Sequence, residues 1–160
     1  MNVRYAIAAG VVLAACSAMT GAGVSPPDVS GTSLPPASAP GATNPAVTEA
    51  NIHQTICVTG WTVTIRPPVS YTSALKRRQM AGIGLTNPAL FEEDHRVPLE
   101  VGGAPTDPAN LYPEPWDGAH GARAKDLIEN RVRADVCAGR MTLAQGQAVF
   151  LGDFWTEVVP

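Results

Sequence analysis

Residues 91–114 read FEEDHRVPLEVGGAPTDPANLYPE, and they concentrate the chemically informative side chains of the chain. Three acids and a histidine stand on the four consecutive positions from Glu92 to His95. Neighbouring side chains of a strand point to opposite faces, so Asp94 can hold a cation while His95 faces a substrate. Carboxylate oxygens suit Mg²⁺, and an imidazole suits a general base near neutral pH. The pair therefore indicates a cation site beside a general base.

The predicted folded unit is residues 51–160, which extends on both sides of this segment and is long enough to bury a small core. Upstream, the run Ile56–Ile65 is rich in β-branched residues and predicts a strand, or two short strands around Gly60. A short helix should follow the next two prolines, with Ser70 or Thr72 as its N-cap. We therefore expect a strand and a helix before the acidic run.

Two further helices are predicted downstream. The first covers residues 119–136, where apolar residues recur at helical spacing, and the second opens with a capping-box pattern between Thr142 and Gln145. The apolar face of the first helix comprises Ala124, Leu127, Ile128, Val132 and Val136. The apolar face of the second comprises Leu143, Ala144, Ala148, Leu151 and Trp155. Together with the strands, these helices indicate an α+β fold.

One motif runs through the central segment: Asp94-His95, Pro98-Leu99, Gly102-Gly103 and Asn110-Leu111. This pattern resembles that of the HNH endonucleases, also called His-Me finger or ββα-metal nucleases. Across essentially all of residues 51–160, the chain is similar to small exported bacterial proteins with an HNH-like core. The resemblance implies a small α+β domain with a ββα-metal core and flanking helices. It also implies a metal-dependent endonuclease that hydrolyses phosphodiester bonds of DNA, or of RNA, outside the cytoplasm.

The resemblance implies a role for each motif residue. His95 would be the general base that takes a proton from the attacking water. Asp94 would be a ligand of one divalent metal ion, Mg²⁺ in the first place, with Mn²⁺ and Zn²⁺ as alternatives. Asn110 would stand at the second strand and orient the catalytic histidine. Cleavage by this family pattern would leave 5′-phosphate and 3′-hydroxyl ends.

The third motif position leaves two alternatives open. His120 is chemically suited to be the second metal ligand, but it lies one residue further from Asn110 than the family pattern has it. If the position falls on Gly121 instead, a ligand is missing, and Asp117 is the remaining candidate. This departure motivates a second functional hypothesis, in which a non-catalytic envelope lipoprotein uses a degenerate HNH-like fold as a binding or structural module.

Charged residues near the motif have less specific interpretations. Arg96 stands beside the general base and is a candidate for contact with a phosphate. Lys125 is a second such candidate, although a lysine on a helix surface is more often solvated, and a pair with Glu129 at i,i+4 is the plainer interpretation. Glu92 and Glu93 are expected to form a solvated acidic run.

The N-terminal third of the chain predicts export and anchoring. Residues 1–15 form a signal peptide whose apolar run is too short to cross a bilayer. The sequence LAAC that ends at Cys16 resembles the bacterial lipobox, so Cys16 is the expected lipid anchor, with an ordinary cleavage site as the alternative. Residues 16–50 are rich in Pro, Ala, Ser and Gly, and they predict a disordered linker. We therefore expect an exported lipoprotein, held at the membrane of the cell envelope by its lipid.

The remaining cysteines and the charge complete the sequence-based expectations. Cys57 and Cys137 are expected to form a disulfide in an exported protein, with two buried free thiols as the alternative. The net charge of −3 excludes a strongly basic protein that coats nucleic acid. Nucleic acid and the membrane are thus the expected partners, and no protein partner is inferred.

Overall fold

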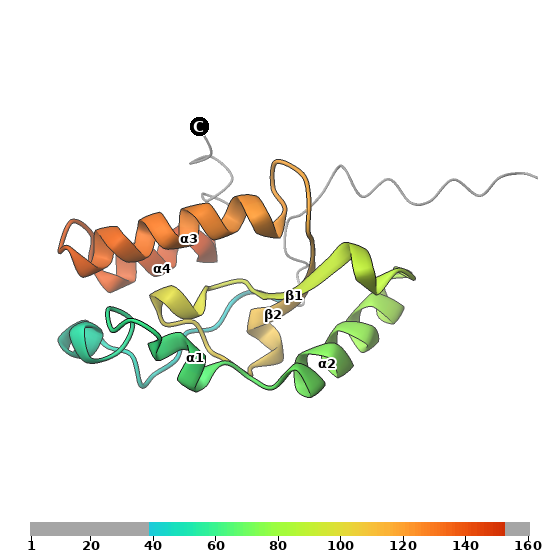
Figure 1. Cartoon of the computed structure of the whole chain (residues 1–160), viewed down its shortest axis with the longest axis horizontal. Helices are drawn as coiled ribbons and strands as arrows, with labels where there is room; N and C mark the ends of the chain where they lie inside the picture. The colour runs from blue at the N-terminus through green and yellow to red at the C-terminus, as the bar shows by residue number, and fades with distance from the viewer. Residues whose placement is uncertain (1–38, 153–160) are drawn as a thin grey trace, which may run out of the picture.

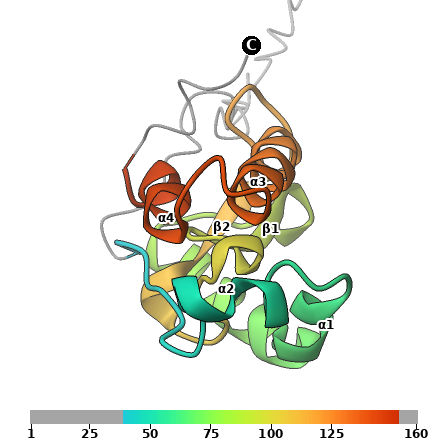
Figure 2. The same cartoon turned by 90° about the vertical axis from the view of Figure 1, so that its left-hand side faces the viewer.

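The computed structural model describes residues 39–152, in which an antiparallel β-hairpin lies between two pairs of helices. The third and fourth helices lie together on one side of the hairpin and the first two on the other (Figure 1, Figure 2). The helices are α1 (Trp61–Ile65), α2 (Val69–Gly82), α3 (Ala122–Cys137) and α4 (Leu143–Leu151). The α+β class expected from the sequence is confirmed.

The described part of the chain begins inside the segment that we expected to be a linker. Residues 39–50 pack on the domain, since Ala39 is buried and Val47 belongs to the hydrophobic core. The predicted signal peptide, Cys16 and the rest of the predicted linker lie outside the described residues. Within residues 39–152, no helix is both long enough and apolar enough to cross a membrane.

The central motif folds as the hairpin. Strand β1 (Phe91–His95) pairs antiparallel with β2 (Leu111–Pro115), in a register that sets His95 opposite Leu111. The connecting residues 96–110 contain two single turns of 3₁₀ helix. This long connection, rather than a tight turn, follows the end of β1, so it is free to build a site around His95.

The side chain of Asn110 closes the base of this connection. Its Oδ1 accepts from the backbone N–H groups of Val97 at 2.9 Å and Ala42 at 3.1 Å. Its Nδ2 donates to the carbonyls of Val97 at 3.0 Å and Ala104 at 2.9 Å. Asn110 is fully buried, and it satisfies four backbone groups that would otherwise be left unpaired in the interior. Asn110, at the end of the connection, therefore holds the start of the connection at Val97 and its middle at Ala104.

Gly103 has a steric role in the same connection. Its N–H donates to the carbonyl of Pro98 at 2.8 Å. A Cβ added at Gly103 would lie only 1.7 Å from the carbonyl oxygen of Val97, a distance that no side chain tolerates. The neighbouring Gly102 has a φ of +77°, which favours glycine in addition. The two motif glycines are thus explained by close backbone packing.

Helix α3 buries a different face from the one predicted. Ile128, Val132 and Val136 are buried as expected, but Leu127 is 71 % exposed. Lys125 and Glu129 are buried instead, at positions that continue the 128–132–136 stripe by steps of three and four residues. The prediction was wrong here because it counted only apolar residues toward the buried face and treated Lys125 as a surface lysine.

Helix α4 begins as predicted and packs by a rotated face. The N–H of Gln145 donates to Oγ1 of Thr142 at 3.1 Å, and the Thr142 N–H donates to Oε1 of Gln145 at 2.8 Å, which confirms the capping box. The buried residues are Leu143, Gly146 and Phe150. The face that was predicted through Ala144, Ala148 and Leu151 is largely exposed, and Trp155 lies outside the described residues.

Close packing against α3 explains the rotation of α4. A Cβ added at Gly146 would lie 2.8 Å from Cγ2 of Val136 and 3.2 Å from Cγ1 of Val132. The glycine therefore faces the neighbouring helix and allows the two backbones to approach. The prediction placed only larger apolar residues at this contact, and so it missed the face that is defined by a small residue.

The predicted strand over Ile56–Ile65 is not formed. This segment makes a series of turns and then α1, whose N-cap Gly60 has a left-handed φ of +80°. Val63 is 75 % exposed, so its β-branched side chain packs against no sheet face. The predicted cap of α2 also differs, because Pro68 is the N-cap, and Ser70 and Thr72 lie inside the first turn. Propensity alone misjudged a segment that has no strand to pair with among the described residues.

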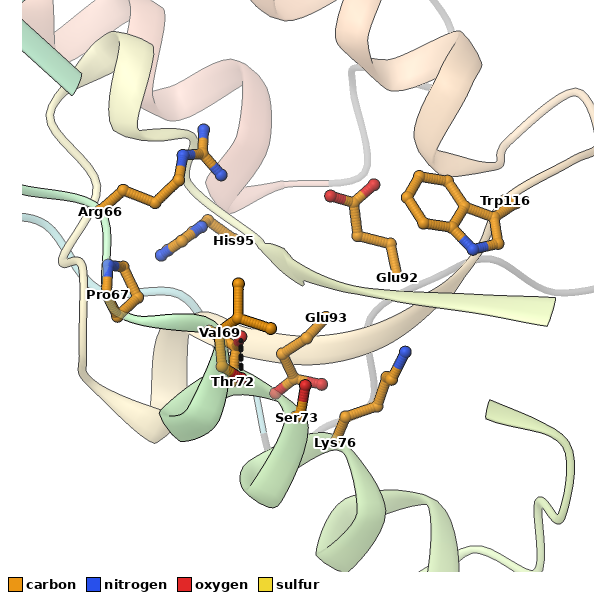
Figure 3. A pocket seen from close by; sticks show the side chains of 10 residues that line it. All are labelled: Arg66, Pro67, Val69, Thr72, Ser73, Lys76, Glu92, Glu93, His95 and Trp116. Carbon is orange, nitrogen blue, oxygen red and sulfur yellow. Dashed lines mark hydrogen bonds between the residues drawn. The ribbon is translucent and has the colours of Figure 1, made fainter. Parts of the chain in front are cut away.

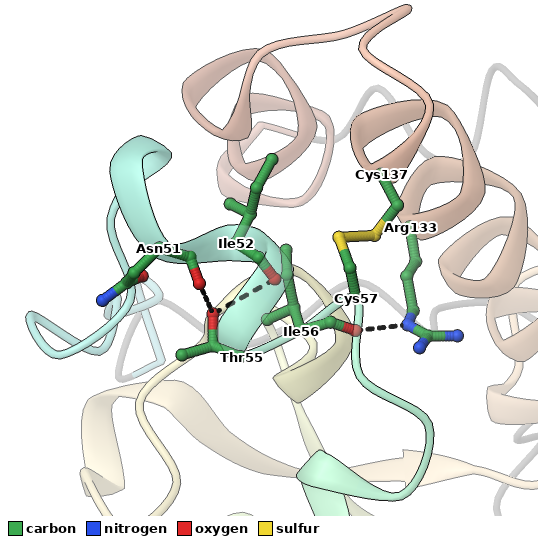
Figure 4. The surroundings of a disulfide bond; sticks show 7 residues. All are labelled: Asn51, Ile52, Thr55, Ile56, Cys57, Arg133 and Cys137. Atoms are coloured by element: carbon green, nitrogen blue, oxygen red, sulfur yellow. Dashed lines mark hydrogen bonds between the residues drawn. A yellow bond between two sulfur atoms is a disulfide. The ribbon is translucent and has the colours of Figure 1, made fainter.

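The expected disulfide between Cys57 and Cys137 is present, and Figure 4 shows that it joins the segment before α1 to the end of α3. The two cysteines are 80 residues apart in the sequence. Beside the disulfide, Nε of Arg133 donates to the carbonyl of Ile56 at 2.7 Å. The bond therefore fixes a segment without regular pairing onto the helical layer.

Removal of the disulfide is predicted to destabilise the fold strongly. The paired change of Cys57→Ala and Cys137→Ala should lower the free energy of unfolding by up to roughly 4–5 kcal/mol, because a long loop in the unfolded chain is released. Urea unfolding of the full chain measures this difference. Dithiothreitol should destabilise the native chain and leave the double variant unchanged. Equal stability of the oxidised chain and the double variant would contradict the prediction.

Candidate functional site

His95, at the end of β1, lies between two adjoining hollows of the surface. The larger hollow has a volume of about 310 Å³ and reaches over the start of α2, and the smaller one has about 100 Å³ and reaches toward α3. Arg66, Glu92 and His95 line both hollows, and Figure 3 shows the three side chains around the larger one. His95, which the sequence indicated as a general base, thus lies at a concave surface, and the neighbouring Asp94 lines the smaller hollow.

The ring of His95 is held in a defined tautomer. Its Nε2 lies 3.0 Å from the carbonyl oxygen of Pro105, and since a carbonyl only accepts, Nε2 carries the proton. Burial lowers the pKa of His95 below its ordinary value, so the ring is neutral at neutral pH. Nδ1 is then an unprotonated nitrogen, which is the state that a general base requires.

Asp94 is fully engaged by the protein. Its Oδ1 accepts from the backbone N–H of His95 at 2.7 Å, and its Oδ2 accepts from Nζ of Lys125 at 2.6 Å. Burial alone would raise the pKa of Asp94, but the adjacent Lys125 ammonium outweighs it and holds the pKa well below the ordinary range. Asp94 is therefore ionised, with a cation of the protein already at its side.

Lys125 is the centre of a buried group, here called the ammonium cluster, which consists of Lys125, Asp94, Glu114 and Glu129. Nζ of Lys125 also donates to Oε1 of Glu129 at 2.7 Å and to the carbonyl of His95 at 2.8 Å, and it lies 3.8 Å from Oε2 of Glu114. The expected pair with Glu129 is confirmed. The expectation that Lys125 lies on a solvated surface is wrong, because the residue is completely buried.

The two glutamates of the ammonium cluster hold their protons more strongly than usual. Burial raises the pKa of Glu114 to about 10 and that of Glu129 to about 8, against the opposing effect of Lys125. At neutral pH both acids are therefore predominantly neutral, and the charge of Lys125 is balanced by Asp94. The cluster thus carries no net charge, which is the cheapest state for a buried ionic group.

Glu92 and Glu93 do not form the solvated acidic run that we expected. Figure 3 shows their side chains leaving β1 in opposite directions. Burial raises the pKa of Glu92 to about 7 and that of Glu93 to about 8. Both carboxylate oxygens of Glu93 are buried without a hydrogen-bond partner among residues 39–152. The prediction failed because the hairpin is covered by helices on both faces.

Arg96 is engaged away from the two hollows. Its guanidinium donates to the carbonyls of Phe150 at 3.1 Å, Leu151 at 2.8 Å and Ala39 at 3.2 Å. It thereby satisfies carbonyl groups at the C-terminal end of α4 and fixes the incoming chain. Of the two phosphate-binding candidates from the sequence, Lys125 is buried and Arg96 is bound to backbone.

The proposed second metal ligand is a surface residue. His120 is exposed in the connection between β2 and α3, and Gly121 is the buried N-cap of α3. Asp117 is exposed and forms an ion pair with Arg123. Among residues 39–152, no group of three or more His, Cys, Asp or Glu side chains is arranged to hold a metal ion. With Asp94 bound to Lys125, these donors do not fit a divalent metal in this arrangement.

Arg66 is the site residue that sequence reasoning missed. It is the C-cap of α1, its side chain is 52 % exposed, and its nearest acid is Glu100 at 3.8 Å. The other cation that lines the larger hollow, Lys76, donates to the carbonyls of Pro88 and Phe91. In the sequence, Arg66 stands before two prolines within the region of family resemblance, and we assigned it no role in the site.

Comparison of the chain with protein-family models, with curated proteins and with solved structures found no match.

Stability is predicted to decrease as the pH rises from about 5 to 8. Glu92, Glu93, Glu114 and Glu129 have raised pKa values, so in this window the folded state holds protons that the unfolded chain has released. The lowered pKa of His95 has the opposite effect, because below the ordinary pKa of histidine the unfolded chain binds one proton that the folded state does not. Urea unfolding at pH 5, 6.5 and 8 measures the trend.

Glu114→Gln is the matched variant for this experiment, because it keeps the shape of the side chain and removes its titration. In Glu114→Gln, the decrease of the free energy of unfolding with pH should be less steep than in the native chain, by up to about 1.4 kcal/mol per pH unit, the value for one proton. A stability that is constant or rises from pH 5 to 8 would show that the acids are ionised in the folded state.

Proposed function

We propose that the chain is an endonuclease-type hydrolase of phosphodiester bonds, with His95 as its general base. The observation that carries the proposal is the neutral ring of His95, whose Nε2 donates to the Pro105 carbonyl and whose Nδ1 is left to accept a proton. The hollows on both sides of this ring give a substrate access to it. The motif that resembles the HNH endonucleases contains this histidine.

In the proposed reaction, Nδ1 of His95 takes a proton from a water molecule as its oxygen attacks the phosphorus. The bond from phosphorus to the 3′ oxygen breaks, and the leaving oxygen takes a proton from solvent, which leaves a 5′-phosphate and a 3′-hydroxyl. General-base catalysis of this kind contributes on the order of 10²–10⁴ in rate. Arg66 stands at the same hollows and is the group suited to bind a non-bridging phosphate oxygen.

A divalent metal ion, expected from the family resemblance, would stabilise the negative charge that develops on the phosphate. The donors of this chain do not fit such an ion as arranged, since Asp94 binds Lys125 and His120 is exposed. The reaction is therefore assigned to His95 and Arg66 alone. The proposed location is the cell envelope outside the cytoplasm, with Cys16 as lipid anchor, where a nuclease is separated from the cell's own DNA.

The bond between Lys125 and Asp94 also favours a second candidate function. An aspartate that is bound to an internal lysine is not available to a metal, so the fold can persist as a non-catalytic binding or structural module of the envelope. This candidate keeps the disulfide, the loop and the buried cluster, and it gives His95 no chemical role.

The three histidines of the chain provide the test of the nuclease proposal. The full chain, with its disulfide intact, is incubated with supercoiled plasmid, single-stranded DNA and RNA, in EDTA or in Mg²⁺ or Mn²⁺. We expect His95→Gln to abolish cleavage, because glutamine can still donate to Pro105 but cannot act as a base. His53→Gln, at an exposed position in the turn after residue 48, should cleave like the native chain.

The same assay separates the remaining alternatives. His120→Gln should leave cleavage unchanged, and cleavage should persist in EDTA. Loss of activity both in EDTA and in His120→Gln would restore the metal-dependent mechanism with His120 as a ligand. The absence of cleavage by the native chain under every condition would support the non-catalytic module.

Arg66→Ala is predicted to lower kcat/KM for plasmid cleavage by about tenfold to a hundredfold, the worth of one charged hydrogen bond. Arg66→Lys should recover part of the loss, because it keeps the charge. Arg77→Ala, which removes an exposed arginine on α2, is the matched control and should have little effect. Equal losses in Arg66→Ala and Arg77→Ala would reduce Arg66 to a contributor to general surface charge.

A further inference from the structure

We propose that the ammonium of Lys125 takes the place of a divalent cation between the hairpin and α3, so that this buried site is complete without a metal ion. The proposal goes beyond the nuclease function and holds whether or not the chain cleaves nucleic acid. It concerns the ammonium cluster and the carbonyl of His95.

Three oxygens surround the ammonium of Lys125 at hydrogen-bond distance. Nζ has Asp94 Oδ2 at 2.6 Å, Glu129 Oε1 at 2.7 Å and the His95 carbonyl oxygen at 2.8 Å. These three oxygens account for the three N–H groups of the ammonium. A carboxyl oxygen of Glu114 follows at 3.8 Å. Carboxyl and carbonyl oxygens are ligand types that Ca²⁺ and Mg²⁺ select.

The origin of these groups shows that the arrangement is a tertiary one. Asp94 and His95 come from β1, Glu114 comes from β2, and Lys125 and Glu129 come from successive turns of α3. The ammonium therefore connects the hairpin to the helix, as a cation bound between them would. Because the side chain of Lys125 is only 1 % exposed, its charge acts on these partners and not on solvent or on a ligand in the hollows.

The charge of Lys125 is needed where it lies. Without it, Asp94 would be an ionised carboxylate in the interior with no cation beside it, which is strongly unfavourable. A divalent ion could replace the ammonium only after the side chain is removed, since Nζ occupies the position between the oxygens.

The test compares thermal unfolding of the full chain in EDTA with that in 1 mM Ca²⁺ or Mg²⁺. The native chain should melt at the same temperature in all three solutions. Lys125→Met should melt roughly 10–20 °C lower in EDTA, because a buried carboxylate has lost its partner. Ca²⁺ should raise the melting temperature of this variant by more than about 5 °C by binding in the vacated position.

The double variant, Lys125→Met with Asp94→Asn, separates cation replacement from general destabilisation. It lacks the unpaired carboxylate, so it should regain much of the lost stability in EDTA and show no response to Ca²⁺. Lys76→Met is the matched control, since Lys76 is the only other lysine and its ammonium donates to two backbone carbonyls. It should lose stability without gaining a response to Ca²⁺.

Two results would overturn the proposal. One is a rise in melting temperature of the native chain with a divalent cation that Asp94→Asn abolishes, since Asp94 would then be a metal ligand already. The other is a Lys125→Met chain whose folding, followed by circular dichroism and resistance to protease, is not improved by Ca²⁺ or Mg²⁺. If Lys125→Met is unfolded in EDTA, its recovery in Ca²⁺ is the supporting result.

Discussion

The contact between Lys125 and Asp94 is the interaction on which the site depends. Asp94 accepts from the backbone N–H of His95, and Lys125 donates to the backbone carbonyl of the same residue. Both polar groups of the His95 main chain are thus held by one ion pair, which is itself held by α3. The imidazole is then placed by its own bond to the Pro105 carbonyl. The ion pair thus connects α3 to the end of β1 and to the main chain of the histidine.

The loop that supplies the Pro105 carbonyl is held by a second set of backbone contacts. Asn110 donates to the carbonyl of Ala104, the residue before Pro105, and Gly103 lies where only a glycine fits. Asn110 therefore orients the histidine through the loop, and none of its hydrogen bonds described above goes to the ring of His95. The sequence resemblance implied the result, an oriented histidine, but not this route.

The sequence was most informative where the relevant partner is near in the chain. The capping box of α4 and the Lys125–Glu129 pair were predicted because their partners are three and four residues apart. The burial of Lys125 was missed because Asp94 lies 31 residues away, and a helical pattern gives a lysine no buried partner. Arg66 was missed for the same reason, since its role depends on a hollow built by distant segments. The sequence thus predicted contacts between residues that are near in the chain, but not the surroundings that distant segments build.

Burial makes the site less negatively charged than the acidic run of the sequence suggests. The raised pKa values of Glu92 and Glu93 leave these acids partly or largely neutral at and below neutral pH, so a phosphate approaching His95 meets less negative charge than the sequence indicates. The pKa of His95 is lowered by the same cause, so the base remains unprotonated into the mildly acidic range. Burial thus raises the pKa values of the two acids and lowers that of the histidine. Together the two shifts create a range of pH in which the proposed base is unprotonated while the two acids are largely neutral. Under the proposed function, a phosphate in that range of pH would meet little negative charge from Glu92 and Glu93, with Arg66 as the positive charge at the edge of the site.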